Sequence, residues 1–271
     1  MVYKHILFTR PAEHVAAVTL HRPDVANALN RAMLAELADA VRRIAVDDDV
    51  HAWTLTGSPR PDGRPWFSAG VDMKEALAGV REPAVDGADI CDAIDDMMKP
   101  SIAVINGTCT TGALEIVLAC DLRIVGRGAQ LSDFHMLRSG MAIGAWGVAA
   151  RLSRLVGVDK AKELLLLSST VDGAEAVRIG LANRMVEDNV LDAEALGVAT
   201  TIAAMPRRGV RATLGYLAMQ ADLSKRDAIH LADLAPDVMG LELRPFRDAA
   251  ARFFDDRPQQ TVAVDKTGSA T

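Results

Sequence analysis

The chain has 271 residues, of which 50% are hydrophobic but only 4% aromatic, and 30 Lys and Arg against 36 Asp and Glu leave a formal net charge of −6. A mean hydropathy of +0.13 favours a packed globular protein over a disordered one. The acidic balance argues against nucleic acid and against an anionic membrane surface as partners. No apolar run approaches the roughly 18 to 20 residues of a membrane span.

The N-terminus and the cysteines bear on the compartment. The first residues lack the basic stretch and apolar core of a signal peptide. Cys91, Cys109 and Cys120 are odd in number and scattered, which is typical of reduced thiols. We therefore expect a cytoplasmic protein without disulfides, and the spacing of cysteines and histidines predicts no metal site.

Strands and helices alternate in the first part of the chain. Residues 13–20 and 51–56 have the β-branched character of strands, and Asn30 can cap a helix that runs through residue 44. A loop follows over 58–65, then a strand-to-helix turn over 66–72 and a surface segment over 76–87. This order is typical of a parallel sheet with crossover helices, and so of an α/β protein.

The pattern continues through the centre and becomes helical toward the C-terminus. Residues 101–105 and 121–125 read as strands, with an apolar helix between them from about 112 to 120. The predicted later helices cover residues 159–167, 174–178, 192–204, 208–221 and 244–254.

Two glycine-bearing turns stand out, at residues 69–71 and 111–113. Each follows a predicted strand and opens a helix. Helix N-termini present backbone N–H groups without internal partners, so two of them aimed at one point can bind a carbonyl oxygen that gains negative charge. Close packing at strand–helix junctions is the commoner explanation of such glycines. Neither turn matches a phosphate-binding fingerprint.

Glu115 lies in the most apolar helix of the chain, three residues after Gly112. Burial raises the pKa of a carboxyl group toward the range useful for proton transfer. The alternative is a capping-box glutamate that folds back onto the start of its own helix. The residues alone leave both interpretations open.

Several segments resemble the enoyl-CoA hydratase/isomerase (crotonase) superfamily. Residues 67–75 are similar to its F-S-A-G-x-D-x-K-E turn, and residues 99–107 to its K-P-x-I-A-x-x-N-G strand. Further matches, in the same order along the chain, lie at residues 22–30, 112–115, 119–124, 154–157 and 180–182. Together they span roughly residues 5 to 257.

The resemblance implies a fold of repeated ββα units in a spiral core, followed by a helical region that packs trimers or hexamers. On this basis we expect a crotonase-like core over residues 1–204 and a C-terminal helical trimerisation region over 205–257. Residues 258–271 lack apolar periodicity and are expected to form a disordered tail.

The resemblance also implies an acyl-CoA thioester substrate and no separate cofactor, since coenzyme A is part of the substrate. The backbone N–H groups of Val71 and Gly112 would form the oxyanion hole, with Glu115 as principal general acid and base. Coenzyme A would run along two backbone segments, which gives these expected substrate-binding residues: Asn27, Ala28, Leu29, Ala69, Gly70, Asp72 and Met73.

His135 departs from the family pattern. Hydratases of the family place a second glutamate twenty residues after the first, and here that position is a histidine preceded by Phe134. Its ordinary pKa near 6.5 still permits proton transfer at neutral pH. A polar residue that merely bonds Ser132 or Asp133 is the alternative. The Gly-rich turn that follows is also altered, to residues 140–147 with Trp146 inside it.

These departures leave the reaction open. An enoyl-CoA hydratase or isomerase that uses Glu115 and His135 is the leading hypothesis. A retro-Claisen hydrolase, which cleaves a carbon–carbon bond, is an alternative because histidines lie near this point in that branch of the superfamily. A non-catalytic acyl-CoA-binding protein is the other alternative.

Overall fold

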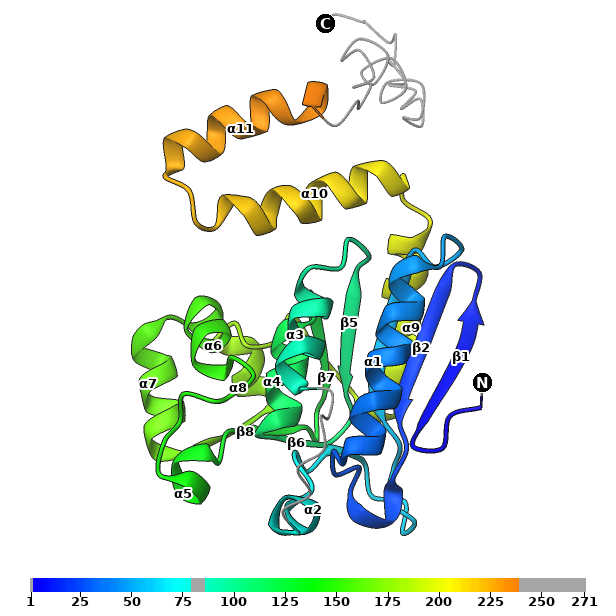
Figure 1. Ribbon diagram of the computed structural model, residues 1–271, viewed down its shortest axis with the longest axis vertical. Coiled ribbons are helices and arrows are strands. Elements are labelled where there is room, and N and C mark those ends of the chain that lie inside the picture. The colour runs from blue at the N-terminus through cyan, green and yellow to red at the C-terminus, as the bar shows by residue number, and fades with distance from the viewer. Residues whose placement is uncertain (1, 79–85, 239–271) are drawn as a thin grey trace, which may run out of the picture. The chain divides into compact units, whose positions relative to one another are not determined.

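The computed structural model describes residues 2–78 and 86–238, and within them the strands form a sheet of six and a sheet of four (Figure 1). The large sheet has the order β1-β2-β3-β5-β7-β10, with β1 and β2 antiparallel and the other neighbours parallel. Its strands are β1 (Ile6–Ala12), β2 (Val15–Leu20), β3 (Ala52–Gly57), β5 (Ser101–Ile105), β7 (Leu122–Gly126) and β10 (Arg184–Val186).

The small sheet has the order β4-β6-β8-β9 and is parallel apart from its last pair. Its strands are β4 (Trp66–Ser68), β6 (Thr108–Thr110), β8 (Gln130–Ser132) and β9 (Thr170–Asp172). The strands β3, β5 and β7 are neighbours in the large sheet, and each is followed by a short strand that joins the small sheet and then by a helix. This is the ββα repeat that the family resemblance implies.

The helices have these bounds: η1 (Pro23–Val25), α1 (Arg31–Val46), α2 (Met73–Leu77), α3 (Gly87–Asp95), α4 (Gly112–Ala119), α5 (His135–Ser139), α6 (Val148–Val156), α7 (Val158–Leu167), α8 (Gly173–Arg178), η2 (Asp188–Val190), α9 (Leu191–Ala203), α10 (Arg207–Gln220) and α11 (Lys225–Val238). None of the described helices is long and apolar enough to cross a bilayer.

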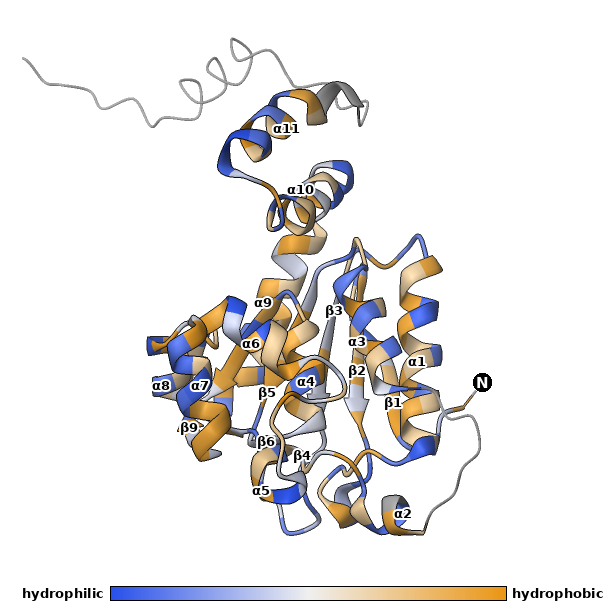
Figure 2. Cartoon of the chain, turned by 60° about the vertical axis from the view of Figure 1, so that its left-hand side comes forward, coloured by the Kyte–Doolittle hydropathy of each residue, from blue (hydrophilic) through white to orange (hydrophobic). Residues whose placement is uncertain are grey.

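Helix α1 forms for the reasons expected from its sequence. The Asn30 side chain accepts a hydrogen bond from Met33 N at 3.0 Å and so caps the first turn. Its buried positions recur every three or four residues, and Figure 2 shows polar and apolar patches alternating along the helix. Helix α4 differs, because all eight of its residues are buried.

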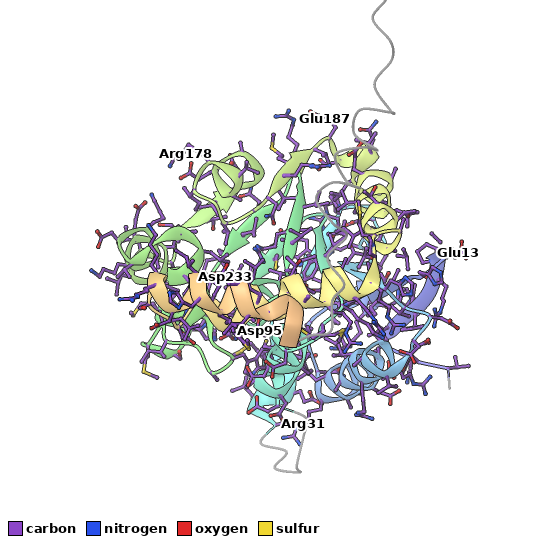
Figure 3. All side chains as sticks on the ribbon, turned by 90° about the horizontal axis from the view of Figure 1, so that it is seen from above. Glu13, Arg31, Asp95, Arg178, Glu187 and Asp233 are labelled. Carbon is purple, nitrogen blue, oxygen red and sulfur yellow. The ribbon has the colours of Figure 1, made fainter. Side chains whose placement is uncertain are left out.

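The large sheet is buried on both faces. Trp53, Leu55, Ala103 and Ile105 pack with α1, α3 and α4 in one cluster, whereas the intervening strand residues pack on the other face against α9. This alternation follows from the two-residue period of a strand. Charged side chains such as Glu13, Arg178 and Glu187 point outward around this core (Figure 3).

Several elements differ from the sequence-based expectation. Residue 14 has φ +59° and lies in the turn between β1 and β2, so the strand predicted over 13–20 begins at Val15 instead. Most of the surface segment predicted over 76–87 lies outside the described residues, and the helix α3 that follows it, with Ile90 and Ile94 buried, was not predicted. Strand β1, the three-residue strands, α5 and α11 were not predicted from the sequence, and of these the three-residue strands and α5 are too short to show a period.

The chain divides into two compact units, Met1–Gly215 and Tyr216–Thr271. In the described part of the second unit, Tyr216 Oη donates a hydrogen bond to Ala228 O at 2.9 Å, which ties the end of α10 to α11. The helix predicted over 244–254 and the predicted tail lie outside the described residues. The trimerisation role of the C-terminal region stays a prediction.

Candidate active site

The two glycine-bearing turns lie side by side, because they follow neighbouring parallel strands. Trp66 of β4 pairs with Thr108 of β6. Gly70 has φ +81°, and a Cβ atom placed on it would lie 2.7 Å from Thr110 O and 3.5 Å from the backbone nitrogen of Gly112. Only glycine fits this conformation and this approach.

Each turn presents an unused backbone N–H group. The bridge between Leu29 and Val71 uses Gly70 O and Asp72 N, which leaves the Val71 N–H unpaired. Gly112 is the first residue of α4, whose first turn has no internal acceptors. Within the described chain neither N–H meets an acceptor. Thr111 between them has φ +56°, a region that is rare for a β-branched residue.

Glu115 is buried, with 1% of its surface exposed, and points away from the start of its own helix. Its Oε1 accepts hydrogen bonds from Trp146 N at 2.9 Å and Val148 N at 3.1 Å. The capping-box interpretation is therefore wrong. Burial is the largest influence on this carboxyl and raises its pKa, although the two backbone donors oppose the shift.

His135 opens α5 and is oriented by Asp133. The backbone N–H of His135 donates to Asp133 Oδ1 at 3.0 Å, and its ring Nδ1 lies 2.8 Å from Asp133 Oδ2. This hydrogen bond is the largest cause of the raised pKa of His135. The ring is therefore fixed with Nε2 directed away from Asp133.

The free edges of the two side chains face each other. His135 Nε2 lies 3.8 Å from Glu115 Oε2. This is too far for a direct hydrogen bond, but a water molecule off the line between the atoms can reach both at about 2.8 Å. Glu115 and His135, which were both predicted from the sequence as site residues, thus lie together in a geometry that suits one bridging water molecule.

A cleft of about 610 Å³ opens beside the first turn. Five of its eleven lining residues are charged, and the lining consists of Arg22, Val25, Ala28, Asn30, Ala69, Val71, Asp72, Met73, Lys74, Glu75 and Arg138. Arg22 is already engaged, since its Nη1 donates to Asp72 Oδ2 at 2.9 Å and to Ala28 O at 2.6 Å. The arginine lowers the pKa of Asp72 against the effect of burial.

Four of the seven expected substrate-binding residues line this cleft: Ala28, Ala69, Asp72 and Met73. The other three lie behind it. Leu29 and Gly70 are buried and join the two segments through the bond from Leu29 N to Gly70 O. The fully buried Asn27 side chain donates to Ser58 O, Trp66 O and Phe67 O, so it holds the loops together instead of facing a ligand.

The sequence did not reveal how four residues contribute to the site. Asp133 was expected only as the partner of a non-catalytic His135, and the Asp133 carboxylate instead orients the ring that faces Glu115. The N–H groups of Trp146, in a loop, and Val148, at the start of α6, have positions that no local pattern reveals. Arg138 lies three residues beyond His135 and reaches the cleft.

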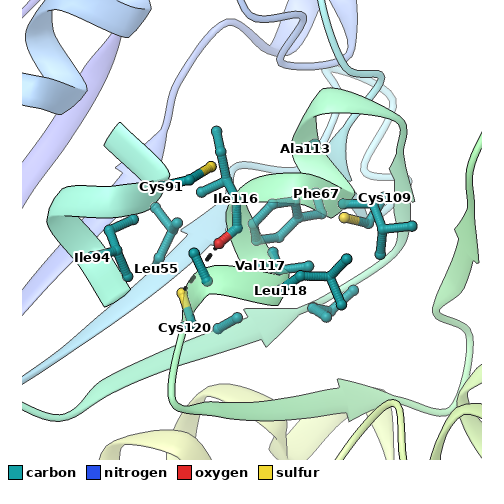
Figure 4. Close-up of a cluster of buried hydrophobic side chains, with 14 of the residues drawn as sticks. Leu55, Phe67, Cys91, Ile94, Cys109, Ala113, Ile116, Val117, Leu118 and Cys120 are labelled. Atoms are coloured by element: carbon teal, nitrogen blue, oxygen red, sulfur yellow. Dashed lines mark hydrogen bonds between the residues drawn. The ribbon is translucent and has the colours of Figure 1, made fainter. Parts of the chain in front are cut away.

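The three cysteines belong to the core and offer no nucleophile. Cys109 lies beside Phe67, and Cys120 Sγ donates a weak hydrogen bond to Ile116 O within α4 (Figure 4). Burial raises the pKa of the Cys91 thiol to about 12 and holds the pKa of Cys109 well above its ordinary value. All three are therefore protonated at neutral pH.

Known proteins share this arrangement of elements. The sequence profile described as enoyl-CoA hydratase/isomerase matches residues 10–234. A Mycobacterium leprae protein with the name "Probable enoyl-CoA hydratase echA8" is 37% identical over 202 residues, which are 73% of this chain and 76% of that protein. The crotonyl-CoA hydratase of Syntrophomonas wolfei is 33% identical over 236 residues, or 84% of this chain and 88% of that protein.

Solved structures agree with the sequence comparison. The crystal structure of an enoyl-CoA hydratase from Bacillus anthracis superimposes with a TM-score of 0.83 at 27% identity, over 94% of this chain and 97% of that one. The chain belongs to the enoyl-CoA hydratase/isomerase family.

Proposed function

We propose that the protein hydrates 2-enoyl-CoA thioesters to 3-hydroxyacyl-CoA, with Glu115 as the catalytic base and His135 as the catalytic acid. The observation that carries this proposal is the 3.8 Å separation of Glu115 Oε2 and His135 Nε2. A pair that holds one water between two proton-transfer groups suits addition of that water to a double bond. An isomerase, by contrast, needs only one group that moves a proton along the acyl chain.

The thioester oxygen is bound by the N–H groups of Val71 and Gly112. These donors strengthen their hydrogen bonds as negative charge collects on that oxygen. In other enzymes one such donor lowers the barrier by about 3 kcal/mol. Coenzyme A follows the cleft along Ala69, Asp72 and Met73, and no separate cofactor takes part. A trimer or hexamer is part of the same proposal and rests on the family resemblance.

The proton transfers balance within the pair. The Glu115 carboxylate takes a proton from the bound water while the water oxygen bonds to C3. The electrons of the C2–C3 double bond then form an enolate. The imidazolium of His135, supported by Asp133, then donates a proton to C2 and restores the carbonyl. The extra proton on Glu115 returns to His135 across the gap, which resets both groups.

A hydrolase that cleaves a carbon–carbon bond is the second candidate. The observation that favours it is the Asp133–His135 pair, since an imidazole oriented by a carboxylate can also activate water for attack on a ketone carbonyl. Glu115 would then protonate the departing carbon. Both candidates use the same oxyanion turns and differ in the carbon that water attacks.

One set of assays separates the candidates. Purified protein is incubated with crotonyl-CoA, with a 3-enoyl-CoA or with a β-diketone, and the products are identified by mass. We expect loss of the conjugated thioester absorbance of crotonyl-CoA and a product heavier by one water. The Glu115→Gln protein, purified in the same way, controls for hydratase carried over from the expression host.

Three other outcomes of these assays would contradict the hydratase proposal. A β-diketone split into two fragments, with crotonyl-CoA untouched, would establish the hydrolase instead. Conversion of the 3-enoyl-CoA to its conjugated isomer without hydration would establish an isomerase. Saturable binding of acyl-CoA with no turnover of any substrate would show a binding protein and contradict the proposal.

A further inference from the structure

The loop that carries Trp146 replaces the Gly-rich turn of the family, and its indole ring has a defined place in the site. A Cβ atom on Gly87 would lie 2.1 Å from the indole Cε2, and a Cβ atom on Gly112 would lie 2.6 Å from Cζ3. The six-membered ring therefore touches the first residue of α3 with one edge and the first residue of α4 with the opposite edge. Any side chain larger than hydrogen at either glycine would displace it.

The backbone of Trp146 is held at both ends. Its N–H donates to Glu115 Oε1, and its carbonyl oxygen accepts from Arg151 Nη1 at 2.6 Å. Arg151 in turn pairs with Asp92 and Asp95 of α3. The ring is thus fixed from its own loop, from α4 and from α3, and it packs against the main core cluster. A side chain held in this way forms a rigid wall.

The wall borders the place where an acyl group must lie. Gly112 supplies a proposed donor to the thioester oxygen, and Glu115 supplies the base near C2 and C3. The indole touches Gly112 directly, and the peptide that carries it bonds Glu115. In the proposed binding mode, atoms beyond C3 of a bound acyl group would run toward this ring.

We propose that the Trp146 indole is the determinant of acyl size in this protein and restricts it to short acyl groups. The inference rests on the proposed acyl-CoA function and adds its substrate class. A fixed aromatic ring excludes additional methylene groups by overlap, because a well-packed wall cannot yield without cost. Removing the ring leaves a void that a longer chain can fill.

The test compares acyl lengths in Trp146→Ala, which keeps the backbone N–H to Glu115. We expect the ratio of kcat/KM for 2-decenoyl-CoA to that for crotonyl-CoA to rise about 10-fold or more, the scale on which a pocket discriminates a methylene group. Trp146→Phe, whose ring is smaller, should shift the ratio by less. Trp146→Phe also provides the test if the Trp146→Ala protein does not fold.

Trp66→Phe is the matched control, because the Trp66 ring lies beneath Arg60, whereas the ring against Gly112 is that of Trp146. Its ratio should equal that of the unaltered protein. An unchanged ratio in folded Trp146→Ala and Trp146→Phe proteins overturns the inference.

Binding separates this inference from the proposed function. If the unaltered protein hydrates nothing, the dissociation constants of butyryl-CoA and decanoyl-CoA are measured by calorimetry. A preference that moves toward decanoyl-CoA by about 10-fold in Trp146→Ala supports the size limit although the hydratase proposal has failed. An unmoved preference, or no binding of either thioester, overturns the size limit as well.

Discussion

Asp133 is the residue on which the protonation of the catalytic pair depends. It is 2% exposed, and both of its carboxylate oxygens bind His135. The hydrogen bond to Nδ1 is the main reason that the pKa of His135 is raised. In the proposed mechanism the imidazolium is the acid, so activity is lost as pH rises through this raised pKa. The acidic limb belongs to Glu115, and the two groups titrate as a pair.

We predict that Asp133→Asn moves the alkaline limb of the kcat/KM profile to lower pH. The substitution removes the negative charge that favours the imidazolium, so His135 loses its proton at lower pH. A residue that only supported the fold would lower the rate at every pH without moving this limb. The pH profile of crotonyl-CoA hydration gives the measurement.

The control is Asp172→Asn at the start of α8, where Asp172 Oδ1 accepts from Glu175 N at 2.8 Å. Asp172→Asn is the same substitution at a carboxylate that contacts neither Glu115 nor His135. The alkaline limb of its kcat/KM profile should therefore not move. Equal profiles for Asp133→Asn and the unaltered protein would show that Asp133 does not act through His135.

At the level of single residues, only part of the site could be predicted from the sequence. Glu115 could be predicted, because a carboxyl in an apolar helix is an anomaly visible without a structure. The choice between base and cap could not, since it depends on Trp146 N and Val148 N, which are 31 and 33 residues further along the chain. The distance from Glu115 to His135 likewise depends on how β6 and β8 pair.

At the scale of elements, the site depends on how closely the turns after β4 and β6 approach. Gly70 is the point of contact, since a Cβ atom placed on it would lie only 2.7 Å from Thr110 O. Gly63 provides a comparison, because it has nearly the same φ, +82°, but nothing within 4 Å of a Cβ. The two glycines thus share a conformational requirement and differ in crowding.

We predict that Gly70→Ala lowers kcat by about 10²-fold, the scale for losing one oxyanion donor. The added methyl group forces the turns apart and moves the Val71 N–H out of place. Gly63→Ala incurs the same left-handed strain, about 1 to 2 kcal/mol, and should lower the melting temperature while kcat is kept. Turnover of crotonyl-CoA and thermal unfolding are measured on both proteins. Full activity of Gly70→Ala would contradict the role of this contact.

Helix α1 and several of the strands of the large sheet could be predicted from the sequence, whereas the short strands, β1 and α11 could not. Helix α1 and strands β3, β5 and β7 have enough residues to show a period. Strands β4, β6 and β8 have three residues each, and their pairing is set by the crossovers on either side. Those short strands are nevertheless the ones that bring the two turns together.

At the scale of the whole molecule, a net charge of −6 opposes a substrate as anionic as coenzyme A. Local cations can offset this field. Lys74 and Arg138 both line the cleft and are exposed, and Arg138 lies over the Phe134 ring at 5.4 Å. The composition of the chain predicted the global charge, but the position of these two side chains required the fold.

We predict that Lys74→Gln and Arg138→Gln each raise KM for acyl-CoA about twofold to fivefold with kcat unchanged. This range corresponds to an exposed ion pair of about 0.5 to 1 kcal/mol. The effect should fade as salt is added, because exposed charges are screened. Lys162→Gln on α7 removes an equal charge from a cation that pairs with Asp159, and it should leave KM unaltered. If Lys74→Gln, Arg138→Gln and Lys162→Gln all have the same KM at low salt, the phosphate groups of coenzyme A do not bind near Lys74 and Arg138.

In the proposed mechanism Glu115 and His135 act as one catalytic unit, and a double-mutant cycle measures this coupling. Initial rates of crotonyl-CoA hydration are compared for the unaltered protein, Glu115→Gln, His135→Gln and the combined variant. Groups that share one water and one proton lose their function together. We predict a fall of about 10²-fold or more in each single variant and almost no further fall in the combined one. If the rate losses of the two single variants multiply in the combined variant, or if His135→Gln keeps full activity, Glu115 and His135 do not act as one unit.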